Sequence, residues 1–434
     1  MTLHSNPEGV GAAIRRMQTS PLDLLVVGGG IVGAAVARDP ARRGLRVGLV
    51  DQADFAFGTS SRSSRLLHGG LRYLSQGRIG LVREASLEKR RLHEIAPHLA
   101  EPLAFIFPTY RGSGWPLWQL HIGVRLYDLL CNNRNLGRSS MLGREALLAC
   151  VPGLRTEKLA GAVRCFDALT NDARLVVDTL RSAEDAGALL ANHTRFLRAD
   201  RAGAGWKAWL QPEGPGDEIG VEARGIINAT GPWSDRVQHS AVRLRLTKGI
   251  HLVLDRSRLP VTDAVALTEG KRLLSVIPWG ERPILGTTDT DYAGDPAHPT
   301  CDDRDVDYLL ATANEAFPRA GLIRQDVIRS WVGLRPLVAN ENGDPSDISR
   351  SHEILHPDRL VGHRRRQAHD LPAHGGAGDR RRGAGTGVDR AAGGHRPGPA
   401  QAGRRAADGW RVAAACVRGS GAPLLLGRMG PASR

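Results

Sequence analysis

The sequence predicts an α/β protein that begins with a Rossmann-like nucleotide-binding unit. Residues 23–27, DLLVV, form an apolar run typical of a strand buried on both faces of a parallel sheet. Three glycines and an alanine-rich helical pattern follow, and a second apolar run, residues 46–51, ends in an acid. The chain of 434 residues has room for two or more domains. We therefore expect a two-domain α/β protein with this unit near its start.

The glycines of the first turn have the spacing G-x-G-x-x-G, at Gly28, Gly30 and Gly33. Such glycines allow a tight turn, let the backbone approach a pyrophosphate and let the next helix pack closely. Asp51 ends the second run, where a carboxylate can accept hydrogen bonds from both hydroxyls of an adenosine ribose. A bare structural turn is the alternative. Strand, glycines, helix, strand and acid in this order favour dinucleotide binding.

A polar, glycine-rich segment follows directly, GTSSRSSRLLHGGLRYL at residues 58–74. Ser60 and Ser61 can donate hydrogen bonds to phosphate or flavin oxygens, and Gly69 and Gly70 permit close approach of the backbone. A polar loop without a binding role is the alternative. Because the cluster adjoins the nucleotide site, we interpret it as part of that site.

The net charge of +14 is concentrated at the end of the chain. Residues 362–434 contain 14 Arg, 4 Asp and no Lys or Glu, which leaves only +4 on the first 361 residues. This tail has 16 Gly and lacks Ile, Phe and Tyr, so it has little bulk for a core and we expect it to be largely disordered. An RNA-binding tail is an alternative, but RG repeats and interleaved aromatics are missing. We expect no specific nucleic-acid partner.

Cysteine usage and hydropathy indicate the compartment. The five cysteines are scattered without C-x-x-C spacing, which favours reduced thiols over a zinc site or disulfides. Residues 1–20 lack the apolar stretch of a secretory signal, and no window is apolar enough to span a bilayer. We expect a cytoplasmic protein without a metal site. Peripheral contact with the inner face of the plasma membrane is left open.

These motifs together resemble the FAD-dependent, quinone-linked glycerol-3-phosphate dehydrogenases. TSSRSSRLLHGGLRYL looks like the signature of that family, and the resemblance is nearly continuous from about residue 20 to 361. Further similar words occur in the family's order: NDARLV (171–176), NATGPW (228–233), KGIHLVL (248–254), IPWG (277–280), GTTDTDY (286–292), VGLRPL (332–337) and ISRSHEI (348–354).

The resemblance implies a glutathione-reductase-like or amino-acid-oxidase-like flavoprotein, with a Rossmann-like FAD-binding domain and a mixed-sheet substrate domain. The FAD-binding domain is expected to be discontinuous, the substrate-binding domain to lie within and after it, and the remainder to be a non-native tail. The FAD-binding domain is expected to comprise residues 20–100, 160–240 and 330–361. The substrate-binding domain is expected to comprise residues 101–159 and 241–329, and the tail residues 362–434.

The tail itself carries a trace of the same family. The residue types that it lacks mostly have AT-rich codons, as expected when GC-rich DNA is translated out of frame. Shifting the implied codons of HRRRQAHDLPAH, residues 363–374, forward by one base permits TVGGKLTTYRRM at every position. The family's sequence after ISRxH reads much like GLVTVGGKLTTYRRM. We predict a frameshift at or just before Gly362.

The resemblance also implies roles for individual residues. The cofactor is FAD, and Ala229, Thr230 and Gly231 form a turn that closes over it. Hydride removal from a secondary alcohol needs a proton acceptor and cations that hold a phosphate dianion. The implied proton acceptor is His251, for which a structural histidine is the alternative.

The implied cations are Arg72 and Arg335, which would bind the substrate phosphate or hydroxyl, and Tyr73 shapes the pocket. For Arg335, an arginine paired with a core carboxylate is the alternative.

The implied reaction is oxidation of sn-glycerol 3-phosphate to dihydroxyacetone phosphate, with a quinone as the electron-accepting partner. An oxidase that passes electrons to O2 is left open. A second alternative is an inactive FAD-binding remnant, because RRRQAHDL at residues 364–371 stands where relatives have the flavin loop GGKLTT. The oligomeric state is left open as well.

Overall fold

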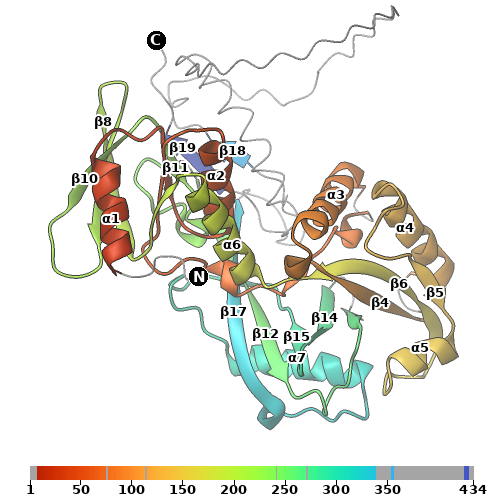
Figure 1. Cartoon of the computed structure of the whole chain (residues 1–434). Coiled ribbons are helices and arrows are strands. Elements are labelled where there is room, and N and C mark those ends of the chain that lie inside the picture. Colours follow the sequence, from red (N-terminus) through yellow and green to blue (C-terminus); the bar gives the residue numbers. More distant parts are fainter. Residues whose placement is uncertain are drawn as a thin grey trace, which may run out of the picture.

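The computed structural model describes residues 7–74, 77–112, 115–240, 242–269 and 272–338, and the backbone strands at 353–355 and 425–429. Figure 1 shows two lobes, one around helices α1 (Pro7–Gln18), α2 (Ile31–Arg42) and α6 (Asp172–Asp185), and the other around a larger sheet. The long strand β17 (Val327–Val338) extends from the second lobe toward the first.

The first lobe contains a sheet with the strand order β18-β19-β11-β1-β2-β7. Its strands are β1 (Leu24–Val27), β2 (Val47–Val50), β7 (Leu189–Ala191), β11 (Ile226–Asn228), β18 (Glu353–Leu355) and β19 (Leu425–Met429). All neighbouring pairs are parallel except β11 with β19. This confirms the predicted Rossmann-like unit.

The strand β19 comes from the tail and is the part of residues 362–434 that the structure describes. The remainder of the tail lies outside the described residues. Its predicted disorder therefore stays a prediction.

Apolar residues pack both faces of the parallel sheet. On one face, Val26 and Leu49 contact the small side chains of α2, such as Ala34 and Ala37, and the inner face of α6. On the other face, α1 packs against the sheet together with a separate antiparallel sheet of β8 (Thr194–Ala202), β9 (Gly205–Pro212) and β10 (Ile219–Ala223). The sheet is thus covered on both sides, as parallel sheets require.

The second lobe is built on a mixed sheet with the order β16-β12-β15-β14-β13-β4-β6-β3, with β17 on β12 and β5 on β6. β13 and β4 pair in parallel, and the other described pairs are antiparallel. The strands are β3 (Leu66–Leu67), β4 (Glu101–Tyr110), β5 (Ser140–Leu142), β6 (Leu159–Leu169), β12 (Leu244–Leu254), β13 (Ala264–Glu269), β14 (Arg272–Trp279), β15 (Arg282–Gly286) and β16 (Thr290–Tyr292). The predicted mixed sheet is confirmed.

Four helices surround this sheet: α3 (Ile79–Ile95), α4 (Leu117–Leu130), α5 (Arg144–Cys150) and α7 (Asp303–Ala316). The largest buried cluster of the lobe joins α7 to strands β12–β15 and includes Leu252, Leu285 and Leu309. The mixed sheet also takes in β3 and β17, from residues 66–67 and 327–338. The predicted domain limits stay a prediction.

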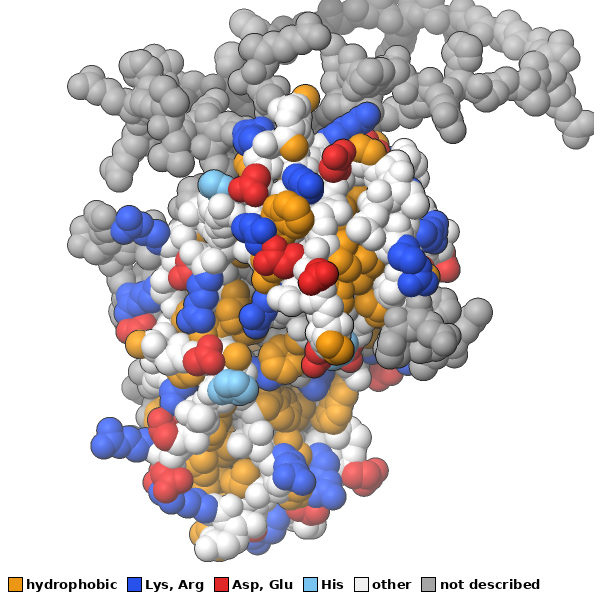
Figure 2. Space-filling view, turned by 90° about the vertical axis from the view of Figure 1, so that its left-hand side faces the viewer, with side chains coloured by type: hydrophobic (Ala, Val, Ile, Leu, Met, Phe, Trp, Pro, Cys, Tyr) orange, Lys and Arg blue, Asp and Glu red, His pale blue; other side chains and the backbone are white. Residues whose placement is uncertain are grey.

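The surface at the left of Figure 1 has mixed charge. Figure 2 shows Lys and Arg side chains on this face interspersed with Asp and Glu. Arg198 pairs with Glu218, and Arg224 pairs with Asp23. The described part of this face therefore has no continuous basic surface of the kind that binds a nucleic-acid backbone.

Candidate functional site

The turn from β1 into α2 brings backbone atoms very close together. Gly28 has φ 109°, and a Cβ on it would lie 2.5 Å from the carbonyl oxygen of Ala229. A Cβ on Gly33 would lie 1.7 Å from the carbonyl oxygen of Gly28. Because both obstacles are backbone atoms, no side chain can move aside, and only glycine fits. The predicted role of these glycines in close packing agrees with this geometry.

The N-terminus of α2 faces the polar segment that follows β2. The Ile31 N–H donates a hydrogen bond to Ser60 Oγ at 3.0 Å, and Gly30 precedes the helix. The first turn of α2 contains no acidic residue. The partial positive charge of the helix N-terminus is therefore not offset by an acid on the helix itself, which suits it to an anion such as a pyrophosphate.

Asp51 lies at the end of β2, beside the glycine turn. Its Oδ2 accepts a hydrogen bond from Gly29 N at 2.6 Å, and its Oδ1 accepts one from Ala53 N at 2.9 Å. Burial raises the pKa of this carboxyl, and the two backbone donors oppose that rise. Each oxygen has a further lone pair, so the carboxylate can still accept the ribose hydroxyls that the sequence predicts.

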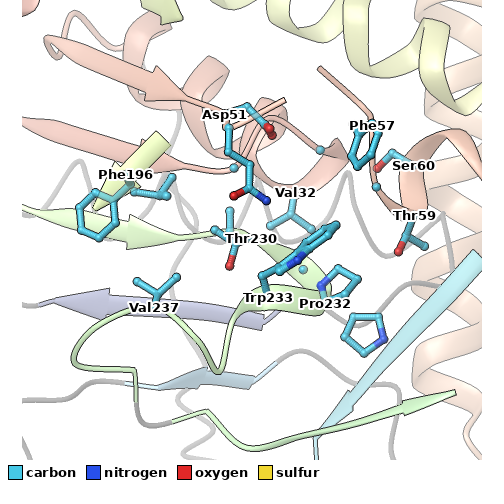
Figure 3. Close-up of a pocket in the computed structure, with 18 of the residues that line it drawn as sticks. Val32, Asp51, Phe57, Thr59, Ser60, Phe196, Thr230, Pro232, Trp233 and Val237 are labelled. Carbon is cyan, nitrogen blue, oxygen red and sulfur yellow. The ribbon is translucent and has the colours of Figure 1, made fainter. Parts of the chain in front are cut away.

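A cavity of about 610 Å³ lies over this turn. Figure 3 shows Asp51, Ser60 and Thr230 at its polar wall, and Phe57 and Trp233 among its apolar side chains. Its volume is that of a small-molecule site. The predicted cofactor residues that line it are Gly28, Gly30, Asp51, Ser60, Ala229, Thr230 and Gly231.

Other predicted cofactor residues do not line this cavity. Gly33 lies behind the turn, where it lets α2 pack against β1. Ser61 Oγ donates to the carbonyl oxygens of Phe57 and Gly58 at 3.3 and 3.2 Å, within the short helix Thr59–Ser61. Contact of Ser61 with the cofactor stays a prediction.

The glycine pair Gly69 and Gly70 lies outside the cavity, against a buried ion pair. Lys89 Nζ is 2.7 Å from Asp167 Oδ1, and the same oxygen accepts hydrogen bonds from Tyr127 OH at 2.6 Å and from Gly69 N at 3.2 Å. A Cβ on Gly69 would lie 2.0 Å from Tyr127 OH. Gly69 therefore has a packing role, whereas its contact with the cofactor stays a prediction.

His251 lies on β12 in a buried position. Its Nε2 is 2.7 Å from Ser64 Oγ, and its ring stacks on Trp331 of β17 with the centroids 5.2 Å apart. Its Nδ1 is buried and has no hydrogen-bond partner among the described residues. Burial, assisted by the positive charges of Arg335 and Arg65, lowers the pKa of His251 to about 3, so the imidazole is neutral at physiological pH.

Arg335 lies on β17 and reaches across β12. A Cβ on Gly249 would lie 2.6 Å from Arg335 Nη2. Because residues two apart on a strand point to the same face, the guanidinium lies on the His251 side of the sheet. Its Nη1 donates to Thr288 O at 3.0 Å and to Asp289 Oδ1 at 3.2 Å. Arg335 therefore pairs with a carboxylate, but Asp289 is 29% exposed and is not the core carboxylate of the alternative. The Arg335 side chain itself is 24% exposed.

The remaining predicted substrate residues belong to the short helix Leu71–Tyr73, which begins after Gly70. The side chain of Arg72 lies outside the described residues, so its role stays a prediction. Tyr73 is buried against Val82 and Tyr127. The structure thus brings His251 and Arg335 together and leaves Tyr73 in a packed cluster.

One cationic residue of this site did not emerge from the sequence. The guanidinium of Arg65 lies over the rings of Trp279 and Trp331, at 5.5 and 5.7 Å from their centroids, and Arg65 has a left-handed φ of 59°. Its charge acts on His251. The sequence signal that could have identified Arg65 was its place in the SSRSSR motif, directly after Ser64, which contacts His251.

Asp172 is a second residue whose role did not emerge from the sequence, although it lies in the NDARLV motif. It lines the cavity and accepts a hydrogen bond from Ser63 Oγ. Burial raises its pKa to about 6. The carboxyl group that faces the cavity is therefore neutral below about this pH and ionised above it.

The described residues include no group of three or more His, Cys, Asp or Glu side chains arranged to hold a metal ion. The four cysteines that the structure describes are free thiols.

Comparisons with known proteins agree with this geometry. The model of the family described as FAD dependent oxidoreductase matches residues 23–361. An alpha-glycerophosphate oxidase of Streptococcus pyogenes is 40% identical over 360 residues, which cover 79% of this chain and 58% of the relative. A glycerol-3-phosphate dehydrogenase of Mycobacterium leprae is 38% identical over 360 residues, with 81% and 61% coverage. The chain thus spans about three fifths of the length of these relatives.

A solved structure gives the same relationship. The glycerol-3-phosphate dehydrogenase of Bacillus halodurans, complexed with FAD, has a TM-score of 0.63 and 33% sequence identity, over 76% of this chain and 60% of that chain. A Mycoplasma pneumoniae L-alpha-glycerophosphate oxidase with FAD has a TM-score of 0.59 at 18% identity, which indicates a shared fold.

Substitution of Gly33 tests the glycine turn. In Gly33→Ala, the added Cβ would overlap the Gly28 carbonyl oxygen and force α2 away from β1. We expect the dissociation constant for FAD to rise at least about tenfold, as followed by flavin fluorescence on titration. Gly80→Ala is the matched control, because a Cβ at Gly80 has open space around it. Unchanged FAD affinity in Gly33→Ala would contradict the assigned packing.

The raised pKa of Asp172 predicts that the free energy of unfolding depends on pH. Because its pKa is about 6 in the folded state and lower in the unfolded chain, folding favours the protonated form, and the free energy of unfolding falls as the pH rises through 6. Asp172→Asn stays neutral throughout. We expect wild type to lose about 2–3 kcal/mol relative to Asp172→Asn between about pH 4 and about pH 8, measured by urea unfolding without added flavin.

The exposed Asp217, changed to Asn, is the control for this measurement and should show no such difference. A difference between wild type and Asp172→Asn that is the same at both pH values would show that Asp172 does not titrate in this way.

Proposed function

The chain belongs to the family of FAD-dependent oxidoreductases, and from this premise we propose that it oxidises sn-glycerol 3-phosphate to dihydroxyacetone phosphate. FAD is the cofactor of this family. The substrate is inferred from relatives at about 40% identity whose names refer to glycerol 3-phosphate, both as oxidases and as dehydrogenases.

The residues at the glycine turn fit the adenosine and pyrophosphate end of FAD. Gly28 and Gly33 leave no room for a Cβ, the N-terminus of α2 carries no acid, and Asp51 offers lone pairs to a ribose. When bound, FAD supplies the ring that accepts the hydride. Thr230 and Ser60 would hold its polar atoms along the cavity wall.

The observation that carries the proposal is a neutral imidazole beside a guanidinium on one face of β12. His251 is neutral at physiological pH, so one of its ring nitrogens carries a lone pair that can accept the proton of the substrate hydroxyl. A phosphate dianion bound nearby would raise the pKa of His251, because an opposite charge favours the imidazolium. The substrate itself would thus make the imidazole a better base.

Cationic side chains would bind the phosphate. Arg335 is oriented by Thr288 O and Asp289, and its side chain is part-exposed. A planar guanidinium can pair with two phosphate oxygens at once. Arg65, which lies on the rings of Trp279 and Trp331, is a further cation on this side, and we retain Arg72 on the evidence of its motif.

We propose a quinone as the electron acceptor. An oxidase that uses O2 is the second candidate, because the first of the relatives described above is named as an oxidase. Hydrogen peroxide release in air, compared with quinone reduction under argon, separates the two candidates. Relatives named as enzymes support either candidate over an inactive remnant.

Use of a quinone implies a place at the membrane. None of the helices in the described part of the chain has the length and apolar character needed to cross a bilayer. We propose peripheral attachment on the cytoplasmic side of the plasma membrane.

We also propose that the printed sequence leaves its ancestral reading frame at or just before Gly362. The family match ends at residue 361, where the composition changes, and the shifted codons of residues 363–374 permit the family's loop sequence. The coding DNA around codon 362, read in three frames, tests this. A downstream frame without family-like sequence would contradict it.

Anaerobic reduction tests the proposed reaction. We expect the purified chain to bind FAD and its visible flavin absorption to bleach when glycerol 3-phosphate is added. His251→Asn removes the proton acceptor and should slow bleaching by about 100-fold or more, since a positioned base contributes roughly that factor. His239→Asn is the control, because His239 is exposed and has a left-handed φ that Asn tolerates.

Glycerol without phosphate should bleach the flavin far more slowly, because no dianion pairs with the arginines. Bound flavin that glycerol 3-phosphate fails to reduce would contradict the proposed substrate. Equal rates for His251→Asn and wild type would exclude His251 as the proton acceptor.

A further inference from the structure

Asp172 lies in the wall of the cofactor cavity and has no part in the reaction proposed above. It is 7% exposed and belongs to the first turn of α6. Ser63 Oγ and the N–H of Asp172 itself donate hydrogen bonds to its carboxyl group, and Ser63 also lines the cavity. The structure thus places a nearly buried acid where the cofactor has to fit.

The N-terminal ends of α2 and α6 lie beside each other at this cavity. Ile31, the first residue of α2, packs against the same buried cluster as Leu175 of α6, and Figure 1 shows the two helices side by side. Ile31 and Asp172 both line the cavity. A pyrophosphate at the N-terminus of α2, as proposed above, would therefore lie on the same side of the cavity as the Asp172 carboxyl.

The surroundings of Asp172 already oppose its ionisation in the empty cavity. Burial raises the pKa of Asp172 to about 6, although the Ser63 hydroxyl and the charge of Arg65 lower it. Arg65 Nη1 is held by Asn171 Oδ1 at 3.4 Å. The other charged side chains on α6 and on the elements packed against it have partners further along the helix: Arg38 donates to Ser182, and His98, Arg174 and Arg181 contact Asp178.

We propose that the binding of FAD takes up a proton from solvent and that Asp172 holds this proton. The pyrophosphate is an anion, and a like charge nearby disfavours a second anion in a buried site. A bound dinucleotide also keeps water from the carboxyl, which disfavours its charged form further. The protonated carboxyl gains an O–H, which can donate a hydrogen bond to an oxygen of the dinucleotide.

Asp51, the other acid at the glycine turn, has a different environment. The N–H groups of Gly29 and Ala53 donate to its two oxygens at 2.6 and 2.9 Å. These donors oppose the rise in pKa that burial causes, and ribose hydroxyls would add further donors. FAD binding would thus stabilise the charge of Asp51, whereas it would oppose the charge of Asp172.

The remaining ionisable side chains of the described cavity wall are Arg195, Arg236 and Asp295. Arg236 lies 3.8 Å from Asp295, so these two offset each other. The inference needs FAD, the cofactor of the family, but it depends neither on the proposed substrate nor on the electron acceptor.

Calorimetric titration with FAD tests the inference on the full chain freed of flavin. The observed binding enthalpy is measured at one pH in buffers of different ionisation enthalpy, and its slope gives the number of protons taken up. We expect uptake close to one proton per FAD at about pH 7.5, because Asp172 is then mostly ionised in the empty cavity. Free FAD has no group that titrates near neutral pH.

The same proton makes the affinity for FAD depend on pH. The dissociation constant of wild type should rise as the pH increases above about 6, by up to about tenfold per pH unit, because the ionised carboxyl must be protonated for binding. Asp172→Asn keeps the size of the side chain and stays neutral. We expect its affinity for FAD to be nearly constant over the same range and its proton uptake to be close to zero.

Asp217→Asn is the matched control, because Asp217 is exposed and lies outside the described cavity wall. It should show the proton uptake and the pH dependence of wild type. Asp172→Ala is a second variant that should also lose the proton uptake, and circular dichroism verifies that all variants fold.

Absence of proton uptake by wild type, or failure of the chain to bind FAD, would overturn the inference. Equal uptake by Asp172→Asn and wild type would assign the proton to another group and overturn it as well. Flavin reduction by glycerol 3-phosphate is measured separately. Proton uptake as expected, with bound flavin that the substrate fails to reduce, would support this inference and contradict the proposed reaction, so the two failures are distinguishable.

Discussion

A single segment, residues 59–65, joins the two halves of the site, and the rest of the arrangement depends on it. Ser60 Oγ accepts from Ile31 N at the start of α2, and Thr59 Oγ1 donates to Leu334 O on β17 at 2.7 Å. Ser64 contacts His251 on β12. Within this short segment, Ser60 thus contacts the start of α2 at the glycine turn, whereas Thr59 and Ser64 contact strands of the mixed sheet. Hydrogen bonds from this one continuous segment therefore set the position of His251 relative to the cofactor cavity.

The mixed sheet then sets the protonation state of His251 through burial and charge. The pairing of β12 with β17 puts His251 opposite Trp331 and Thr247 opposite Arg335. The indole and the surrounding core remove water from the imidazole, and Arg335 adds positive charge nearby. A buried site with excess positive charge disfavours imidazolium and favours a bound dianion. The same two features thus keep His251 neutral and suit this side of β12 to the phosphate of the substrate that we propose.

Local patterns in the sequence were enough to predict the glycine turn, Asp51 and the mixed sheet, because each depends on neighbouring residues or on a family motif. Contacts between distant segments could not be predicted. Arg65 gains its position from Trp279 and Trp331, which lie more than 200 residues further along the chain. The carboxylate partner of Gly69 is Asp167, on another strand. Such residues carry no local signal. In the sequence alone, a glycine that packs against a side chain cannot be distinguished from a glycine that approaches a cofactor.

The inner side of α4 contacts a buried ion pair that also holds the turn at Gly69. Tyr127 on that inner side donates to Asp167 Oδ1, which also accepts from Gly69 N and pairs with Lys89 of α3. A buried ion pair with this many donors is costly to break, so α3, α4 and the turn at Gly69 form one rigid unit. The short helix Leu71–Tyr73 begins directly after this turn. The ion pair of Lys89 with Asp167 therefore helps to set the position from which the helix with the predicted substrate residues Arg72 and Tyr73 starts.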